Sequence, residues 1–140
     1  MPHRILLVDD QEDLLRLLTN ALTRAGFEVT ATTDGREALS EVHSLAYDLL
    51  VTDVVMPDVS GYELLREAAQ DIPVIAMTGN LTAIGGADLF RASTIGLGGV
   101  EALRKPFEPA DLIEKIESVL EDPSRRLPRR HPLDEEHLTP

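Results

Sequence analysis

The stretch Arg4-Ile-Leu-Leu-Val8, followed at once by Asp9-Asp10, decides how this chain folds. The apolar run from Ile5 to Val8 is continuous rather than alternating, which is typical of a strand buried on both faces of a parallel sheet. Two neighbouring carboxylates do not fit inside such a core, so we place them at the edge of the sheet, where this strand ends.

Short apolar runs and segments with helical periodicity alternate along the rest of the chain. Strands are expected at residues 4–8, 28–32, 48–52, 74–77 and 100–104. Helices are expected at residues 12–25, 34–42, 62–69, 87–95 and 109–120. Because strands and helices alternate, we predict an α/β fold, a doubly wound five-stranded parallel sheet with helices on both faces.

The composition excludes several classes of protein. Cysteine is absent, so a disulfide framework and thiolate chemistry are ruled out. The net charge of −12 argues against direct nucleic-acid binding, because a phosphate backbone demands clustered basic residues. The apolar run near the N-terminus is too short for a signal peptide. Since no apolar stretch reaches the roughly 18 to 20 residues of a membrane helix, we expect a cytoplasmic protein without membrane insertion.

The last residues differ in kind from the rest of the chain. Residues 1–121 are expected to form one domain, and residues 122–140 carry four of the nine prolines together with Arg125-Arg126, Arg129-Arg130 and an acidic run. This composition is typical of a disordered tail or a loosely docked arm. A partner-binding peptide is the alternative interpretation of the same segment.

Reactive side chains follow four of the five predicted strands. Asp9 and Asp10 follow the first strand, Asp53 the third, Thr78 the fourth and Lys105 the fifth. In open parallel sheets the working site lies outside the carboxyl ends of the strands. We therefore expect these five side chains to meet at one edge of the sheet.

Three carboxylates at one edge favour a bound divalent cation. Without one their mutual repulsion would force a proton onto a carboxylate. Magnesium prefers oxygen ligands and takes one or two carboxylates with waters and phosphate oxygens. We expect Asp10 and Asp53 to bind Mg²⁺ directly, Asp9 to act through a bound water, and the backbone carbonyl of Val55 to complete the set.

The same residues suggest phosphoryl transfer to Asp53. A carboxylate on a rigid strand is a competent nucleophile toward phosphorus, and the reaction needs positioning and charge neutralisation. Lys105 would supply a further positive charge from the side opposite the metal. The Thr78 hydroxyl would donate a hydrogen bond to the phosphoryl oxygen once it has arrived, which makes this contact a natural switch.

Four motifs together resemble the receiver domain of bacterial two-component response regulators. They are Ile5-Leu-Leu-Val-Asp-Asp10, Asp53-Val-Val-Met-Pro57 followed by Ser60-Gly61, Thr78-Gly79, and Lys105-Pro-Phe107. The resemblance covers residues 4 to about 121. It implies a flavodoxin-like strand order of 2-1-3-4-5 and a cis peptide bond between Lys105 and Pro106.

The resemblance also implies partners. A sensor histidine kinase or a histidine phosphotransfer protein would donate the phosphoryl group, and the protein would not otherwise be an enzyme beyond self-phosphorylation and self-dephosphorylation. The last strand and its flanking helices would form the face for a downstream protein or a homodimer. Since no output domain follows in this sequence, we expect a stand-alone, chemotaxis-regulator-like protein that signals by phosphorylation-dependent binding or by phosphorelay.

Two features depart from the receiver pattern. Ala102 stands where many receivers carry the aromatic ring that moves with the threonine, which puts that coupling in doubt. Thr78 and Lys105 are 27 residues apart, more than is usual, so residues 79–99 hold either a tolerated insertion or a phosphorylation-dependent lid. The resemblance also implies that Val55 and Asn80, two positions beyond Asp53 and Thr78, tune the lifetime of the phosphorylated state. The apolar Val55 offers no help to an attacking water, which predicts slow self-dephosphorylation.

Two other functions are open. A magnesium-dependent phosphohydrolase would use Asp53 as a turnover nucleophile, but such enzymes usually carry a second aspartate at the position that Val55 occupies here. A receiver-like interaction module that is never phosphorylated would not need the acidic set together with Lys105. Both alternatives are weaker than the phosphorylated receiver.

Overall fold

The computed structural model describes residues 2–44, 46–54, 61–79 and 100–121. The elements in chain order are β1 (Arg4–Val8), α1 (Glu12–Arg24), β2 (Glu28–Thr32), α2 (Gly35–Glu41), β3 (Leu49–Asp53), α3 (Gly61–Ala68), β4 (Val74–Thr78), β5 (Val100–Arg104) and α5 (Pro109–Glu121). The predicted helix at 87–95 and the tail at 122–140 lie outside the described residues, so the predicted domain boundary stays a prediction. None of the described helices has the length and apolar character that a membrane crossing requires.

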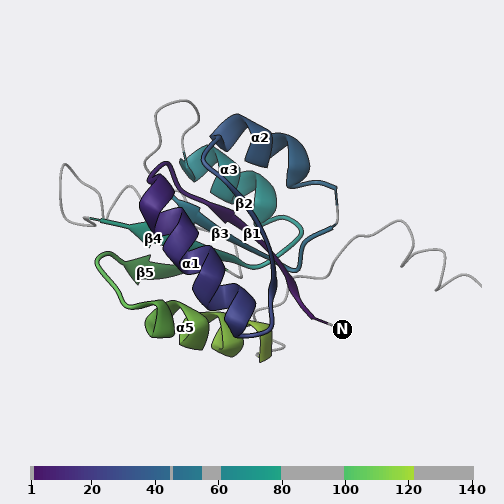
Figure 1. Ribbon diagram of the computed structural model, residues 1–140. Helices are drawn as coiled ribbons and strands as arrows, with labels where there is room; N and C mark the ends of the chain where they lie inside the picture. The colour runs from purple at the N-terminus through teal and green to yellow at the C-terminus, as the bar shows by residue number, and fades with distance from the viewer. Residues whose placement is uncertain (1, 45, 55–60, 80–99, 122–140) are drawn as a thin grey trace, which may run out of the picture.

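The sheet has the strand order β2-β1-β3-β4-β5, and every neighbouring pair is parallel. Helices α1 and α5 cover one face of it, and α2 and α3 cover the other (Figure 1). This is the doubly wound fold with the order expected from the sequence, and both expectations are confirmed.

Two separate cores follow from the alternation of side chains along β1. Ile5 and Leu7 pack into the cluster under α1 and α5, whereas Leu6 and Val8 pack into the cluster under α2 and α3. All four side chains are fully buried. A strand that faces two cores must be apolar at every position, which explains the continuous run in the sequence.

Local signals place the ends of the helices. The Asp34 side chain accepts hydrogen bonds from the backbone nitrogens of Arg36 and Glu37, at 2.9 and 3.4 Å, and so caps the start of α2. Just beyond α1, Gly26 adopts a φ of 99°, a left-handed conformation that glycine reaches at low cost.

Three elements begin one residue away from the predicted position, and one of them is the second helix, which was expected at 34–42 and is Gly35–Glu41. The third strand was expected at 48–52 and is Leu49–Asp53, and the third helix was expected at 62–69 and is Gly61–Ala68. Asp48 lies just before β3, and its carboxylate accepts a hydrogen bond from the backbone nitrogen of Arg4 at 2.8 Å. The shift brings Asp53 into β3 as its last residue, so its backbone is fixed by the sheet.

Candidate functional site

The period of the strands brings three of the predicted side chains to one side of the sheet. Side chains two positions apart along a strand point to the same face. Asp9, Asp53 and Lys105 each stand two positions after a residue that packs under α1 and α5, namely Leu7, Val51 and Leu103. Asp9, Asp53 and Lys105 therefore lie on the same side of the sheet as this core, at the carboxyl ends of their strands.

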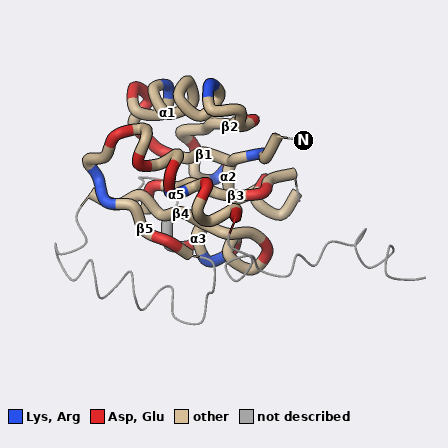
Figure 2. The backbone as a smooth tube through the Cα atoms, turned by 90° about the horizontal axis from the view of Figure 1, so that it is seen from below, with Lys and Arg blue, Asp and Glu red and all other residues tan. Residues whose placement is uncertain are grey.

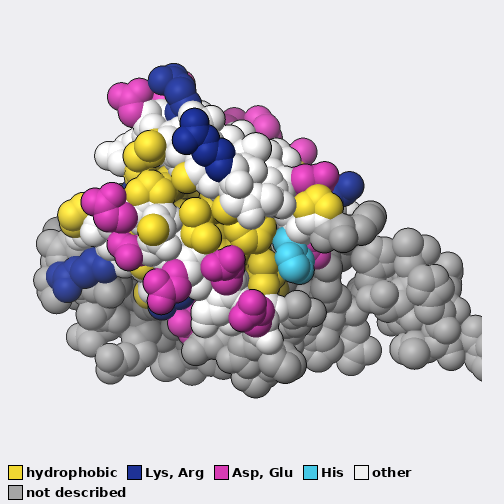
Figure 3. Space-filling model, turned by 60° about the horizontal axis from the view of Figure 1, so that its bottom comes forward, with side chains coloured by type: hydrophobic (Ala, Val, Ile, Leu, Met, Phe, Trp, Pro, Cys, Tyr) yellow, Lys and Arg dark blue, Asp and Glu magenta, His cyan; other side chains and the backbone are white. Residues whose placement is uncertain are grey.

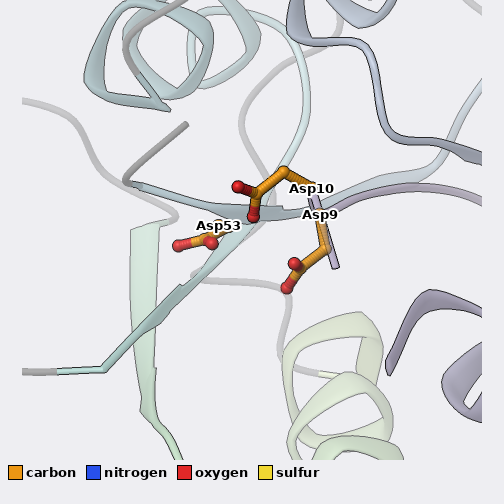
Figure 4. Close-up of side chains that lie close together, drawn as sticks. All are labelled: Asp9, Asp10 and Asp53. Carbon is orange, nitrogen blue, oxygen red and sulfur yellow. The ribbon is translucent and has the colours of Figure 1, made fainter. Parts of the chain in front are cut away.

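The three aspartates form one group. Each of Asp9, Asp10 and Asp53 offers a carboxylate oxygen, and these oxygens all lie within 4.8 Å of one another. Figure 4 shows Asp10 and Asp53 reaching into the same space, with Asp9 beside them. Asp9 is fully buried and Asp53 is 7% exposed, whereas Asp10 is exposed to solvent. The group is thus buried at Asp9 and Asp53 and open to solvent at Asp10.

Lys105 closes the inner side of this group. Its ammonium lies 2.7 Å from Oδ2 of Asp9 and 3.4 Å from Oδ2 of Asp53. Asp9, Asp53 and Lys105 are called the rim cluster below. Burial works to lower the pKa of Lys105, but the hydrogen bond to Asp9 and the charges of both aspartates outweigh it, so the pKa is raised above its ordinary value.

The structure refines the expected position of the lysine. Lys105 was expected to supply positive charge for phosphoryl transfer, and its ammonium lies closer to Asp9 than to Asp53. The other Asp9 oxygen, Oδ1, accepts a hydrogen bond from the backbone nitrogen of Gln11 at 2.9 Å. Both Asp9 oxygens are therefore engaged by the protein, which leaves Asp10 and Asp53 better placed to offer oxygens to an ion.

The contact at Gln11 was missed in the sequence. An aspartate side chain often accepts from the backbone nitrogen two residues further along, and this turn signal was available at Asp9. The contact matters because it fixes the orientation of a carboxylate that is fully buried.

The remaining predicted residues lie beside this group or outside the described part. Thr78 is 4% exposed at the end of β4, one residue beyond Met77, which is the register partner of Asp53. The Thr78 carbonyl accepts a hydrogen bond from the backbone nitrogen of Lys105 at 2.8 Å. Val55 lies outside the described residues, so the predicted role of its carbonyl is still a prediction. The peptide bond between Lys105 and Pro106 is cis, as expected.

The donor set fits a hard divalent cation. Within the described part of the chain, three carboxylates face one ammonium, so this group carries more negative than positive charge. All three ligand candidates offer oxygen, which Mg²⁺ prefers over nitrogen or sulfur. The strand order and this acidic rim together define a flavodoxin-like α/β protein with its site at the carboxyl edge of the sheet.

Comparison with known proteins identifies the family. The family model of the response regulator receiver domain matches residues 5–117. The regulatory protein VanRc of Enterococcus gallinarum is 31% identical over 122 residues, which cover 86% of this chain and 51% of that protein. A CpxR homologue of Haemophilus influenzae is 35% identical over 119 residues, covering 84% of this chain and 50% of that protein.

Solved structures show the same likeness. The chemotaxis response regulator CheY4 of Vibrio cholerae has a TM-score of 0.72 and 26% identity, covering 85% of this chain and 99% of that chain. A CheY-like receiver domain of Methanospirillum hungatei has a TM-score of 0.74 and 29% identity, covering 86% of this chain and 94% of that chain.

The chain belongs to the response regulator receiver domain family. Members of this family act in two-component regulatory systems, and phosphorylation and magnesium binding at an acidic pocket are typical of them. The chain spans about half the length of the curated relatives that it matches. The activity and the partners of the whole protein are therefore not shown by these relatives, and the expectation of a stand-alone protein is still a prediction.

Proposed function

We propose that this receiver accepts a phosphoryl group on Asp53 from a histidine kinase or a histidine phosphotransfer protein in the cytoplasm. The modified protein passes the signal on by binding a protein partner or by relaying the phosphoryl group. The observation that carries this proposal is the rim cluster together with Asp10: a nearly buried carboxylate at a strand end, an ammonium 3.4 Å from it, and two further carboxylates within reach of one ion.

The proposed reaction is a transfer between two side chains. A carboxylate oxygen of Asp53 forms a new bond to phosphorus while the bond from phosphorus to the donor's imidazole nitrogen breaks, and the freed imidazole takes up a proton from solvent. Asp53 is suited to this step because β3 holds its backbone and only a small part of the residue is exposed. Its orientation therefore costs little entropy at the moment of reaction.

The proposal assigns a task to each neighbour of Asp53. Asp10 and Asp53, with the Val55 carbonyl, would hold Mg²⁺, and Asp9 would contact it through a water. When bound, this ion neutralises negative charge on the acids and on the arriving phosphoryl oxygens. Lys105 is already positioned between two carboxylates and would add an ion pair to a phosphoryl oxygen.

The proposed switch runs through Thr78 without an aromatic partner. Thr78 ends β4, and its hydroxyl would donate to the phosphoryl group once Asp53 is modified. Ala102 lies in β5 opposite Ala76, so two small side chains occupy the place where a ring would stand. We infer that the movement at the end of β4 is not reported by a swinging ring at position 102.

Phosphorylation in vitro tests the proposal directly. Acetyl phosphate and Mg²⁺ should add the mass of one phosphoryl group, and peptide mapping should place it on Asp53. Asp53→Asn should abolish the increase, and Asp10→Asn should slow it strongly. Glu67→Gln removes an exposed carboxylate on α3 and should leave it unchanged.

Two results would overturn the proposal. One is no mass increase in the intact chain, which would favour an unphosphorylated interaction module. The other is continuous release of inorganic phosphate from a generic phosphomonoester, which would favour a phosphohydrolase. Partners of the modified state would be sought by affinity capture with and without beryllofluoride.

A further inference from the structure

A groove lies between β5 and α5, and no member of the rim cluster lines it. Its volume is about 450 Å³. Its lining combines three kinds of side chain: the apolar Leu103, Pro106 and Phe107, the acidic Asp111 and Glu114, and the basic Arg104 and Lys115, with Ser118 beside them. This groove therefore offers apolar surface beside charges of both signs.

The groove continues into a second hollow along α5, with a volume of about 470 Å³. Glu114 and Ser118 line both, and the second hollow adds Glu117 and Glu121. The three glutamates recur at three- and four-residue spacing, so they share one face of the helix. They are called the glutamate strip below.

The glutamate strip lacks a counter-charge within the described part of the chain. No ion pair to Glu114, Glu117 or Glu121 occurs among those residues, and the nearby Lys115 is paired with Glu101 at 3.6 Å. Like charges at this spacing on a helix repel one another. Figure 2 shows acidic residues recurring along α5, and Figure 3, with the α5 side brought forward, shows acidic side chains beside a hydrophobic area.

The sequence directly after α5 has the complementary character. Four of the chain's 13 basic residues fall into two pairs, Arg125-Arg126 and Arg129-Arg130, called the arginine quartet below. Leu127-Pro128 separates the pairs and supplies apolar surface. The quartet starts only four residues beyond Glu121, so the covalent link holds it near the strip at a high effective concentration.

We propose that residues 122–132 turn back along α5 and dock on the β5–α5 groove. The arginine quartet pairs with the glutamate strip, where guanidinium groups form two parallel hydrogen bonds to a carboxylate. Leu127-Pro128 meets the apolar part of the groove. The strip from Glu114 to Glu121 spans about 10 Å of helix, and an extended chain covers that distance in about three residues, so the reach is sufficient.

Docking would make the tail an internal competitor for this face. A protein that binds the groove must first displace the arginine quartet, so its apparent affinity would fall by the fraction of molecules with a docked tail. This inference goes beyond phosphorylation and does not rest on it.

Disulfide trapping in the intact chain tests the docking. The chain has no cysteine, so Ser118→Cys with Leu127→Cys gives a single pair of thiols. At low protein concentration the intramolecular disulfide should form on the order of tenfold faster than in the control pair Ser118→Cys with Leu138→Cys, because docking raises the effective concentration. The quantity measured is the rate of closure by non-reducing electrophoresis and mass spectrometry.

Charge reversal gives the decisive comparison. Changing the arginine quartet to Glu should abolish the rate advantage, and changing the glutamate strip to Arg should do the same. Reversing both together should restore it, because the charges are complementary again. Circular dichroism checks that each variant is folded.

Two results would overturn the proposal. A rate of closure at position 127 that is insensitive to either reversal would show that charge does not hold the segment. Disulfides that form mainly between two molecules, at a rate that follows protein concentration, would show that the occupant of the groove is a second copy of the chain.

Discussion

Two clusters among the described residues each place one basic side chain between two carboxylates, and they differ in burial. In the rim cluster the Lys105 side chain is 17% exposed and Asp9 is completely buried. In the surface cluster, His43 beyond α2 lies between Glu67 of α3 and Asp71, at 3.0 and 3.2 Å, with His43 49% and Glu67 44% exposed. The two clusters are arranged similarly, but the surface cluster is much more exposed to solvent than the rim cluster.

The difference in burial determines what each cluster contributes. A buried carboxylate that loses its partner is left without water or a counter-charge, so the rim cluster must be complete for the protein to stay stable. An exposed ion pair exchanges its partner for water at little cost. We therefore expect the rim cluster to respond strongly to mutation and to metal, and the surface cluster to respond weakly and mainly to pH.

The largest effect is expected from removing the lysine. Lys105→Met leaves Asp9 buried without its ammonium and should lower the free energy of unfolding by about 3 kcal/mol in metal-free buffer. His43→Gln, the matched change in the surface cluster, should cost only about 0.5 kcal/mol. Urea denaturation of both variants measures the contrast. Equal losses would show that burial does not separate the clusters.

Magnesium should distinguish the clusters next. An ion that binds only the native state raises the free energy of unfolding by about 2.7 kcal/mol at a hundredfold excess over its Kd. The wild type and Glu67→Gln should both gain this stability, whereas Asp10→Asn should lose most of the gain. A full response in Asp10→Asn would place the ion elsewhere.

A smaller effect is expected when pH is varied, because the contribution of the surface cluster to the free energy of unfolding depends on the charge of His43. Both ring nitrogens of His43 approach carboxylate oxygens, which only accept hydrogen bonds, so the protonated ring fits best. The hydrogen bond to Glu67 is the chief reason that the pKa of His43 is raised above 6.5, and partial burial offsets some of it.

The sign of the pH effect follows from this raised pKa. The stabilisation is fully present below pH 6.5 and is lost as the pH rises through the folded-state pKa. The difference between wild type and His43→Gln should therefore be about 0.5 kcal/mol near pH 5.5 and close to zero near pH 8.5. Lys105, whose pKa is raised from 10.5, should not change charge in this range. A difference that grew with pH would contradict the arrangement.

Raising the salt concentration should give the smallest change in the free energy of unfolding. At 1 M salt the Debye length is about 3 Å. The contribution of His43 at pH 5.5 should then fall to about 0.2 kcal/mol or less. The loss caused by Lys105→Met should change little, because buried charges are poorly screened. Repeating the urea series at low and high salt makes this comparison.

Much of the fold could be predicted because the signals are local. The run from Ile5 to Val8 predicts a strand facing two cores, and β1 has the predicted bounds. Asp34 and Gly26 mark helix ends by side-chain capping and by backbone conformation. The order of the strands is not a local property, and it came from resemblance to a family.

The details of the site could not be predicted, since they depend on register and packing. The sequence indicates that Lys105 reaches the same edge as the aspartates, but the choice of Asp9 as its nearer partner depends on how β1, β3 and β5 are placed relative to one another. The surface cluster was also missed, because His43 and Glu67 are distant in sequence and meet only when α2 packs beside α3.

Lys105 is held at both of its ends, and this has a mechanical consequence. Its backbone nitrogen donates to the carbonyl of Thr78 in β4, and its ammonium donates to Asp9 at the end of β1. One residue thus works as a tether across the sheet. Any displacement that pulls the tip of β4 inward or outward must either carry the ammonium along or break one of these two bonds.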